Sequence, residues 1–394
     1  MKHRIVVLGA GYAGATAAGR LARRLHPGDT EITVVNADTD FVERVRMHQL
    51  ATGQDLKPRP LSNIYAGTGV TVRPARVTAV DADRRTVALV DEQGAEEIAY
   101  DTLVYALGSA SADHGVPGAV EHAYDIAGRP SALRLRDRLD QVAAGGTVLV
   151  VGGGLTGLEA VTEIAEARPD LDVAIAVRAG LGDWLNEKAQ QHLHRVCDRL
   201  DITVHEHTDI ARVQATGAIT VDGRAIPAQV TVWAAGFAVH PIAAATTLTV
   251  AATGQIIVDA TMRSVSHPEV YAVGDAGLAE GPGGRPLRMS CASGIPMAWQ
   301  AADAIAARLT GRKIPRAPLR YFNQCVSLGR RDGIIQYVTA DDRAKPSLLT
   351  GRLAARYKEV VCRGAAWGIS HPVLYPVRRH RIVTARTGIR AAAS

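Results

Sequence analysis

The chain has 394 residues, of which 47% are hydrophobic, and a formal net charge of +6. This length exceeds what one hydrophobic core usually fills, so two or three domains are expected, and the apolar content excludes a disordered chain. The charge is mild for this length, and no cluster of lysines and arginines alternates with aromatic residues. Composition therefore argues against nucleic-acid binding and favours anionic small ligands.

The four cysteines are far apart, and no C-x-x-C pair occurs. This spacing excludes a local redox disulfide and a cysteine-rich zinc site, so no metal is expected. Residues 225–258 contain no Asp, Glu, Lys or Arg, but their prolines, threonines and β-branched clusters predict short strands rather than a membrane span. The chain begins directly with a strand, which predicts no signal peptide. We expect a cytoplasmic protein with at most peripheral membrane contact.

Residues 4–14 predict a dinucleotide-binding turn. Four apolar residues at 5–8 predict a buried parallel strand, and Gly9, Gly11 and Gly14 follow with the spacing Gly-x-Gly-x-x-Gly. Gly9 allows a tight turn, Gly11 lets a backbone amide approach a pyrophosphate, and Gly14 lets the following helix lie close to the strand. The N-terminus of that helix offers free N–H groups and a positive dipole end to the phosphates.

The next elements continue the first domain. Residues 31–35 predict a second strand, and Asn36 follows where such folds place a ribose-binding acid. An asparagine can still hydrogen-bond a hydroxyl. Residues 70–90 alternate in short runs around a turn at 81–85, which predicts an inserted β-meander. Residues 100–109 return to a buried strand that ends in a small-residue turn.

The pattern then repeats. Residues 145–157 form strand, glycine turn and helix again, with Gly152, Gly154 and Gly157 at the same spacing and Glu159 early in the helix. A strand follows at 172–177, and Arg178 comes after it. Residues 230–237 resemble residues 102–109, because each segment is an apolar strand that ends in a small-residue turn with a glycine. Because the opening and closing parts recur in order, the chain contains two copies of one dinucleotide-binding unit.

A third signature lies at 270–276, where a strand ends at Gly274 and places Asp275 at its carboxyl end, the side on which ligands bind in open α/β sheets. A helix is predicted at about 296–309. Strands at 321–328 and 333–338 predict a hairpin, and a helix is expected at about 348–361. The tail from 378 to 394 is basic, and we expect it to be loose.

Together these residues resemble the two-dinucleotide-binding-domain flavoproteins of the pyridine nucleotide-disulfide oxidoreductase superfamily without the redox disulfide, and within them the type II NADH:quinone oxidoreductase-like group. The markers are the two glycine turns, Glu159, residues 105–108 and residues 271–275. The resemblance implies an α/β fold with two Rossmann-like domains, one inserted in the other, and a small α+β C-terminal domain. It assigns 1–112 and 237–312 to an FAD domain, 113–236 to a nicotinamide domain, and 313–394 to the C-terminal domain.

The resemblance also implies the cofactors FAD and NADPH or NADH. Glu159 would be the catalytic residue, where nicotinamide and flavin meet, and residues 41–53 would line the isoalloxazine. The first glycine turn, Asn36, Val77 and Asp275 would hold FAD, and the second turn the nicotinamide cofactor. The implied cofactor-binding residues are Gly9, Gly11, Tyr12, Ala13, Gly14, Asn36, Arg44, Val77, Ala106, Gly108, Gly152, Gly154, Leu155, Thr156, Gly157, Arg178, Gly236, Gly274, Asp275 and Ala292.

The reaction implied is hydride transfer from NAD(P)H to flavin, followed by electron transfer to a small-molecule acceptor, a quinone or quinone-like aromatic. Members of this group that bind the membrane carry a strongly apolar C-terminal helix, whereas residues 354–361 here are too polar for firm insertion. A respiratory role is therefore in doubt, and a role in a biosynthetic pathway is equally open. An arginine can pair with the 2′-phosphate of NADPH, so Arg178 predicts a preference for NADPH, unless it is a solvated loop residue.

Several alternatives stay open at this point. The protein could be a ferredoxin-type reductase for a protein partner, a flavin-dependent monooxygenase, or a non-enzymatic flavin-binding sensor. Cys291 could be a buried small hydrophobe or could meet Cys325 and Cys362 as a redox thiol. Arg44, Arg46 and His48 could flank the flavin or form a solvated face. The oligomeric state is also open, with a homodimer among the options.

Overall fold

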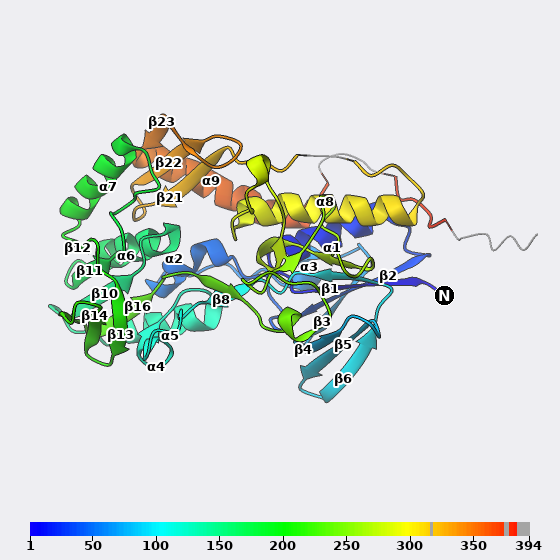
Figure 1. Cartoon of the computed structure of the whole chain (residues 1–394), viewed down its shortest axis with the longest axis horizontal. Helices are drawn as coiled ribbons and strands as arrows, with labels where there is room; N and C mark the ends of the chain where they lie inside the picture. The colour runs from blue at the N-terminus through cyan, green and yellow to red at the C-terminus, as the bar shows by residue number, and fades with distance from the viewer. Residues whose placement is uncertain (316–317, 374–377, 384–394) are drawn as a thin grey trace, which may run out of the picture.

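Two parallel five-stranded sheets form the frame of the protein (Figure 1). The computed structural model describes residues 1–315, 318–373 and 378–383. The first sheet has the order β19-β7-β1-β2-β3, with bounds Val270–Ala272, Thr102–Tyr105, His3–Leu8, Thr30–Asn36 and Val70–Pro74. The second has the order β12-β11-β10-β16-β9, with bounds Thr203–His205, Asp172–Ala176, Thr147–Val151, Val230–Trp233 and Ala123–Tyr124. The predicted α/β class is confirmed.

The two sheets are built on the same local plan. In the first, Leu8 at the end of β1 pairs with Val35 of β2 and with Tyr105 of β7. In the second, β10 ends in the same register between β11 and β16. Both central strands consist of apolar side chains that are at most 6% exposed over residues 5–8 and 148–151, as expected for strands covered on both faces.

Each central strand leads through a glycine turn into a helix, α1 (Tyr12–Arg24) or α6 (Leu155–Ala167). Gly9 has φ +89° and donates its N–H to Val35 O at 2.8 Å, a backbone conformation that favours glycine. A Cβ placed on Gly14 would overlap the carbonyl oxygen of Gly9, so only glycine lets α1 lie this close to its strand. Gly157 stands in the same relation to Gly152 in the second copy.

The chain crosses between the sheets twice, at β8 (Ser109–Ser111) and at β17 (Phe237–Val239), and these two segments pair antiparallel. Two small antiparallel sheets flank the frame. They are β4 (Arg76–Asp81), β5 (Thr86–Asp91) and β6 (Gly94–Ala99), and β13 (Ile210–Gln214), β14 (Gly217–Thr220) and β15 (Ala225–Pro227). The prediction that residues 70–74 belong to the meander is wrong, because β3 pairs in parallel with β2. The meander instead gains β6, whose side chains are mostly exposed and lack an apolar alternation.

The long helix α8 (Cys291–Leu309) packs along α1 on one face of the first sheet (Figure 1). It begins earlier than predicted. Ser290 caps it by accepting a hydrogen bond from Ser293 N, and Pro296 lies inside the helix rather than in its first turn. The remaining elements are η1 (Arg44–Arg46), α2 (Met47–Ala51), α3 (Leu61–Ile64), α4 (Ala119–His122), α5 (Arg129–Asp140), α7 (Glu187–Arg199), η2 (Ala243–Ala245), β18 (Ile256–Ile257), η3 (Gly274–Ala276), β20 (Gly277–Leu278) and η4 (Pro282–Gly284).

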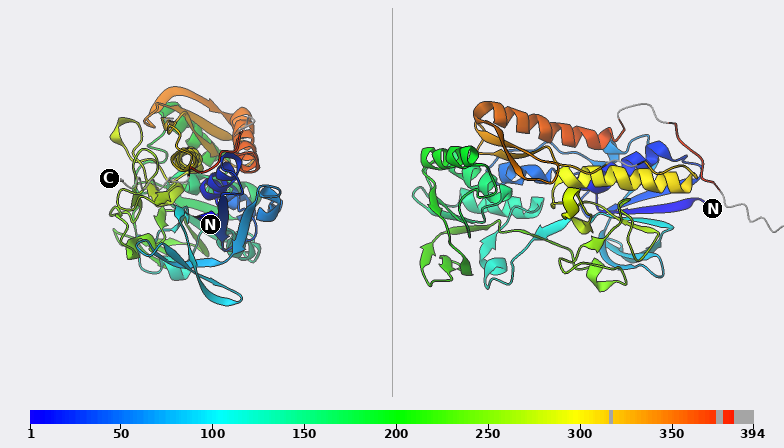
Figure 2. Two further views of the ribbon diagram at one scale, coloured as in Figure 1. Left: turned by 90° about the vertical axis from the view of Figure 1, so that its right-hand side faces the viewer. Right: turned by 45° about the horizontal axis from the view of Figure 1, so that its top comes forward.

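The last part of the described chain forms a three-stranded antiparallel sheet and a helix (Figure 2). The predicted hairpin is present as β21 (Asn323–Ser327) and β22 (Gly333–Val338), and β23 (Ala344–Thr350) was not predicted because its first four residues are exposed. Helix α9 (Gly351–Ser370) extends nine residues beyond its predicted end at 361. Val326 and Ile334 pack into the core of the second sheet, whereas Ile369 packs into the core of the first.

Residues 380–382 are held against the end of α1 and the turn that leads to β2, contrary to the expectation of a loose tail. His26 N donates to His380 O at 2.9 Å, and Ile382 N donates to the Asp29 carboxylate at 3.1 Å. Arg381 forms an ion pair with Asp29 at 2.7 Å. The rest of the predicted tail, from 384 to 394, lies outside the described residues.

The first glycine turn gives a matched pair of substitutions. Gly14→Ala should lower the unfolding free energy by about 3 kcal/mol, because the new methyl overlaps the Gly9 carbonyl and must push α1 off its strand. Gly11→Ala is the control, because no described residue other than the chain neighbours of Gly11 comes within 4 Å of a Cβ at that position. Thermal unfolding of the cofactor-free proteins measures both, and equal melting temperatures for the two variants would contradict the expectation.

Candidate active site

Three backbone segments meet at the carboxyl end of the first sheet: the start of α1, the turn η3, and the start of α8. A Cβ added at Gly294 would lie 3.2 Å from the Cα of Gly274, and one added at Gly274 would lie 3.0 Å from the Cβ of Ala13. The segments therefore touch with almost no side chain between them. The predicted residue Ala292 lies in the first turn of α8 and is exposed.

The start of α1 is suited to a pyrophosphate. Its N-cap is Gly11, and no side chain of the described chain caps the helix there. The space beside Gly11 is open to 4 Å. Free N–H groups, the helix dipole and close access to the backbone are the features that bind a dinucleotide phosphate, so the residues present fit FAD. The N-cap of α6, Gly154, has the same two properties, and Leu155 and Thr156 begin that helix.

Asp275 stands beside this meeting point with two partners from other elements. Its Oδ2 accepts a hydrogen bond from Ser109 Oγ at 2.6 Å and lies 3.6 Å from the guanidinium of Arg44. The Arg44 guanidinium also lies over the Phe237 ring, 5.6 Å from its centroid, and close to Gly108. The structure thus brings Arg44, Gly108, Gly274 and Asp275 together at the point where the chain crosses between the sheets.

Other predicted residues support the first glycine turn. The Asn36 side chain accepts a hydrogen bond from Ala10 N at 2.8 Å and donates one to Asp38 O at 2.7 Å, so it braces the turn. Tyr12 packs edge-on against Phe41 with ring centroids 4.9 Å apart, and its buried hydroxyl has no partner among the described residues. The ribose role of Asn36 stays a prediction. Ala106 and Val77 are both buried, at the end of β7 and in β4.

The predicted nicotinamide residues lie around the second glycine turn. Gly152 N donates to Ala176 O at 2.9 Å, which ties the turn to the end of β11. Arg178 follows that strand with a side chain that is 75% exposed, and it lies 3.4 Å from Asp209. Gly236 has φ +152° at the second crossing between the sheets. An exposed guanidinium with one exposed acidic neighbour is free to meet an incoming anion.

Glu159 lies in a buried cluster drawn from three parts of the chain. Its carboxylate forms a close ion pair with Lys358 Nζ from α9 and accepts a hydrogen bond from Ser327 N at 3.2 Å. Both charged side chains are only about a tenth exposed. Because a buried charge without a partner is strongly destabilising, each of the two charges offsets the cost of burying the other. Burial lowers the pKa of Lys358 from its usual value to about 8.

His48 is the fourth residue of this cluster and lies beside both Glu159 and Ser327. Its Nδ1 lies 3.6 Å from Glu159 Oε2, too far for a hydrogen bond, and its Nε2 lies 3.4 Å from Ser327 Oγ. Burial, together with the cations Lys358, Arg330 and Arg46, lowers the pKa of His48 well below its usual value, which keeps the ring neutral. The reading of Arg46 and His48 as a solvated face is wrong, because both side chains are buried.

Arg46 instead fastens η1 to α9. Its guanidinium forms ion pairs with Glu43 at 3.0 Å and with Glu359 at 2.9 Å, and it also donates to Gln49 at 3.1 Å. Helix α2, which follows directly, packs against α5 and α6 and contributes Met47 and Leu50 to the core of the second sheet. The segment 41–53 therefore reaches from the first glycine turn to the helix that carries Glu159.

Sequence reasoning identified Glu159 but not Lys358 or Ser327. A signal for Lys358 is present in the sequence, because Ala354, Lys358, Cys362 and Ala366 recur every four residues and form the buried face of α9. A lysine in such a row needs an acidic partner. Nothing near Lys358 in the chain indicates which acid that is, since the partner lies on α6, about 200 residues earlier in the chain.

The three cysteines near the site show no disulfide. Cys291, Cys325 and Cys362 are free; Cys362 is buried, and the other two are partly buried. Burial and the nearby Cys362 thiol raise the pKa of Cys291 to about 11, and burial raises that of Cys325 to about 12. Thiols that stay protonated at neutral pH are poor nucleophiles, which favours the reading of Cys291 as a packing residue.

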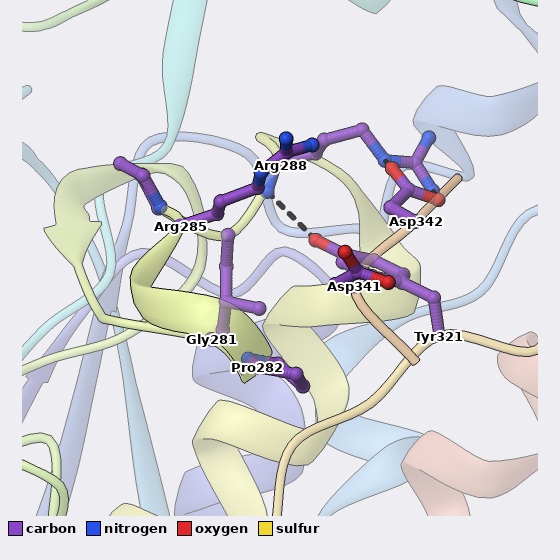
Figure 3. Close-up of a pocket in the computed structure, with 9 residues that line it drawn as sticks. Gly281, Pro282, Arg285, Arg288, Tyr321, Asp341 and Asp342 are labelled. Carbon is purple, nitrogen blue, oxygen red and sulfur yellow. Dashed lines mark hydrogen bonds and ion pairs between the residues drawn. The ribbon is translucent and has the colours of Figure 1, made fainter. Parts of the chain in front are cut away.

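A cavity of about 210 Å³ lies beside the start of α8 (Figure 3). One wall is formed by Gly281, Pro282 and residues 285–288, and the other by Tyr321, Asp341 and Asp342. The Tyr321 hydroxyl accepts a hydrogen bond from Arg288 N at 2.7 Å, and the Arg288 side chain pairs with Asp342 at 2.5 Å. This volume is below that of a typical ligand pocket, so we read the region as the contact between α8 and the C-terminal sheet.

The chain belongs to the pyridine nucleotide-disulphide oxidoreductase family, whose model matches residues 3–306. This span contains both glycine turns, Glu159 and Asp275, and the match confirms the resemblance drawn from those residues. An NADH dehydrogenase-like protein of Mycobacterium tuberculosis is 30% identical over 317 residues, which cover 75% of this chain and 78% of the relative.

Two further comparisons extend to nearly the full chain. A demethylphylloquinone reductase of Synechocystis is 25% identical over 378 residues, covering 90% of this chain and 92% of the relative. The structure of NDH2 from Plasmodium falciparum in complex with NADH superposes with a TM-score of 0.80 at 15% identity, covering 94% of this chain and 96% of that one. At this low identity, the likeness to NDH2 shows a shared fold.

Proposed function

We propose that this protein is an FAD-dependent oxidoreductase that passes a hydride from NAD(P)H to the flavin and then electrons to a quinone or quinone-like small aromatic acceptor. The observation that carries the proposal is the buried Glu159–Lys358 pair, which lies on α6 just after the open glycine turn at Gly154. The names of the relatives support the acceptor class, since one of them reduces demethylphylloquinone. Bound FAD would supply the redox chemistry, and the protein supplies orientation and electrostatics.

We assign one cofactor to each of the two parallel sheets. FAD belongs with residues 1–112 and 237–312, where the uncapped start of α1, Asp275 and Gly274 meet. The nicotinamide cofactor belongs with residues 113–236, at the uncapped start of α6. We assign residues 313–394 to a third part, whose described strands and helix contact α6, α7 and α1. The crossings at β8 and β17 support these boundaries.

The Glu159 cluster is suited to handling protons. Reduction of a quinone by NAD(P)H consumes one proton from solution, because the hydride supplies one hydrogen of the quinol and the second must come from water. Lys358 Nζ and Glu159 hold a proton between them in a site that excludes bulk water. Ser327 N–H stabilises the carboxylate when that proton leaves.

We also propose that NADPH is preferred over NADH. Arg178 takes the position after β11 at which such folds recognise the ribose, and no acid stands there. Its guanidinium is exposed and has only the long contact to Asp209. A bidentate arginine suits a 2′-phosphate and cannot accept a hydrogen bond from a 2′-hydroxyl.

We further propose a cytoplasmic protein whose α9 makes peripheral contact with an anionic membrane. Leu353, Val360 and Trp367 are seven residues apart on α9 and more than half exposed, and Arg356 and Arg363 are exposed beside them. Apolar side chains flanked by arginines are typical of helices that lie in a membrane interface. None of the helices in residues 1–315, 318–373 and 378–383 is long and apolar enough to cross a membrane.

The first test is anaerobic stopped flow with the FAD-loaded protein. NADPH or NADH should bleach the flavin, and a quinone should restore its absorbance. Glu159→Gln should slow the quinone step about 100-fold, because proton transfer by a positioned group typically contributes this much. The control is Glu187→Gln, at the exposed start of α7, which should leave both steps unchanged.

Other outcomes of the same experiment would overturn the proposal. Reoxidation by ferredoxin but by no quinone would indicate a reductase for a protein partner. Oxygen consumption in step with an aromatic substrate would indicate a monooxygenase. A flavin that NADPH and NADH both fail to bleach would indicate a binding protein without this activity.

The coenzyme proposal has its own variant. Arg178→Glu should lower the ratio of kcat/KM for NADPH over NADH at least tenfold, because the new carboxylate repels the 2′-phosphate and can accept a ribose hydroxyl. Arg212→Glu, an exposed arginine on β13, is the control for the change in net charge. A wild-type preference for NADH, together with an unchanged ratio in Arg178→Glu, would contradict the idea.

The membrane proposal can be checked by cosedimentation with vesicles of phosphatidylglycerol and phosphatidylcholine. Replacing Leu353, Val360 and Trp367 together by serine should abolish binding, because it removes the apolar side chains that enter the interface. Val120→Ser is the control, since Val120 is 72% exposed on α4. If the triple variant instead halves the mass of the protein in solution and leaves vesicle binding intact, the face of α9 is a homodimer contact.

A further inference from the structure

We propose that Glu163 is a second proton-holding carboxylate of this site, which takes a proton from solution and passes it along α6 to the Glu159 cluster. The inference rests on the proposed quinone reductase function, which consumes one proton from solution in each turnover. It assigns a role to a buried acid that neither hydride transfer nor cofactor binding uses.

Glu163 is a buried carboxyl group with one oxygen that lacks a hydrogen-bond partner among the described residues. Glu163 follows Glu159 by one helical turn on α6 and is only 2% exposed. Residues spaced by four on a helix are neighbours on one face. Its Oε1 accepts a short hydrogen bond from Gln54 Nε2, and its Oε2 is buried without a hydrogen-bond partner among the described residues.

That unpartnered oxygen makes the ionised form of Glu163 expensive. Burial without a hydrogen bond to one oxygen destabilises an ionised carboxylate more than it destabilises the neutral acid in the same place. Burial accordingly raises the pKa of Glu163 to about 7, although the Arg330 cation and the Gln54 hydrogen bond oppose the rise. The side chain therefore gains and loses its proton near neutral pH, as a relay must.

The surroundings give this proton a route to solution. Glu166, a half-buried side chain, follows Glu163 on the same face of α6, and its Oε2 accepts a hydrogen bond from Arg330 N at 2.5 Å. Gln54, on the loop after α2, covers Glu163 at the edge of the cluster. The charged and titratable groups on the elements packed around this face are Glu159 and Glu166 on α6, Arg330 in the turn before β22, His48 on α2, and Lys358 on α9.

The proton balance of the step is simple. When Lys358 and Glu159 give a proton to the reduced acceptor, the proton on Glu163 moves to Glu159 and leaves Glu163 ionised. No hydrogen bond joins the two carboxyl groups among the described residues, so the proposed transfer runs through one bridging water. Glu163 then takes one proton from solution at the edge formed by Gln54 and Glu166. No electrons move, and one proton enters the protein for each proton that leaves with the quinol.

The test compares Glu163→Gln and Gln54→Leu with wild type in the FAD-loaded protein. The rate of flavin reoxidation by a quinone, followed from pH 5.5 to pH 9, should fall in wild type with a midpoint near 7. Glu163→Gln should remove this dependence and lower the rate about tenfold at pH 6. Gln54→Leu should move the midpoint to higher pH, because the lost hydrogen bond favours the ionised form. Flavin reduction by NAD(P)H should be unchanged in both variants.

Thermal unfolding gives a readout that does not depend on turnover. The pKa of Glu163 is raised in the folded protein, so the folded state binds this proton more tightly than the unfolded state does. The contribution of Glu163 to the free energy of unfolding is therefore fully present below pH 4.3, roughly the pKa of an unfolded glutamate. This contribution is lost as the pH rises through 7, the pKa in the folded protein. Glu163→Gln should therefore lessen the fall in melting temperature between pH 5.5 and pH 8, and Glu187→Gln should not.

The inference is overturned if Glu163→Gln keeps the wild-type midpoint in reoxidation and the wild-type fall in melting temperature. Slower reoxidation at every pH with an unmoved midpoint, in either variant, would also overturn it, because that is the effect of a structural role alone. Failure of the proposed function is distinguishable, since wild type itself would then show no reoxidation by quinones.

Discussion

A carboxylate and an ammonium that are both withdrawn from water must stay together, and this constraint shapes the protein around Glu159 and Lys358. Glu159 lies on the helix of the second nucleotide unit, and Lys358 lies on the last helix described. Their contact requires β21, β22 and α9 to lie on α6. Losing either partner would leave an uncompensated buried charge, which is far more costly than losing a surface ion pair.

The C-terminal sheet and helix satisfy this constraint by packing on both cores at once. Val326 and Ile334 enter the core of the second sheet, and Ile369 enters the core of the first. Arg46 adds an ion pair from η1 to Glu359 on α9. The two nucleotide units, between which the chain crosses at β8 and β17, are therefore also held by a third element.

Much of this protein was predictable where a function depends on local spacing. The glycine turns, Asp275 and Glu159 were recognisable because a tight turn, a close backbone approach and a helix start each restrict residue type within a few positions. The exposed strands β6 and β23 were missed, because exposed strands carry little apolar alternation. The start of α8 was misplaced, because Pro296 resembles a first-turn proline and Ser290 is the true cap.

The sequence by itself determined the fold class, the duplicated nucleotide unit and one member of the central ion pair, since these follow from short-range steric rules. Only the tertiary structure decided that Lys358 is the partner of Glu159, that His48 is buried and neutral, and that Glu163 has an oxygen without a partner. Such facts depend on which surfaces meet after folding. Burial and pairing of charges are long-range properties, because they depend on side chains that lie far apart in the chain.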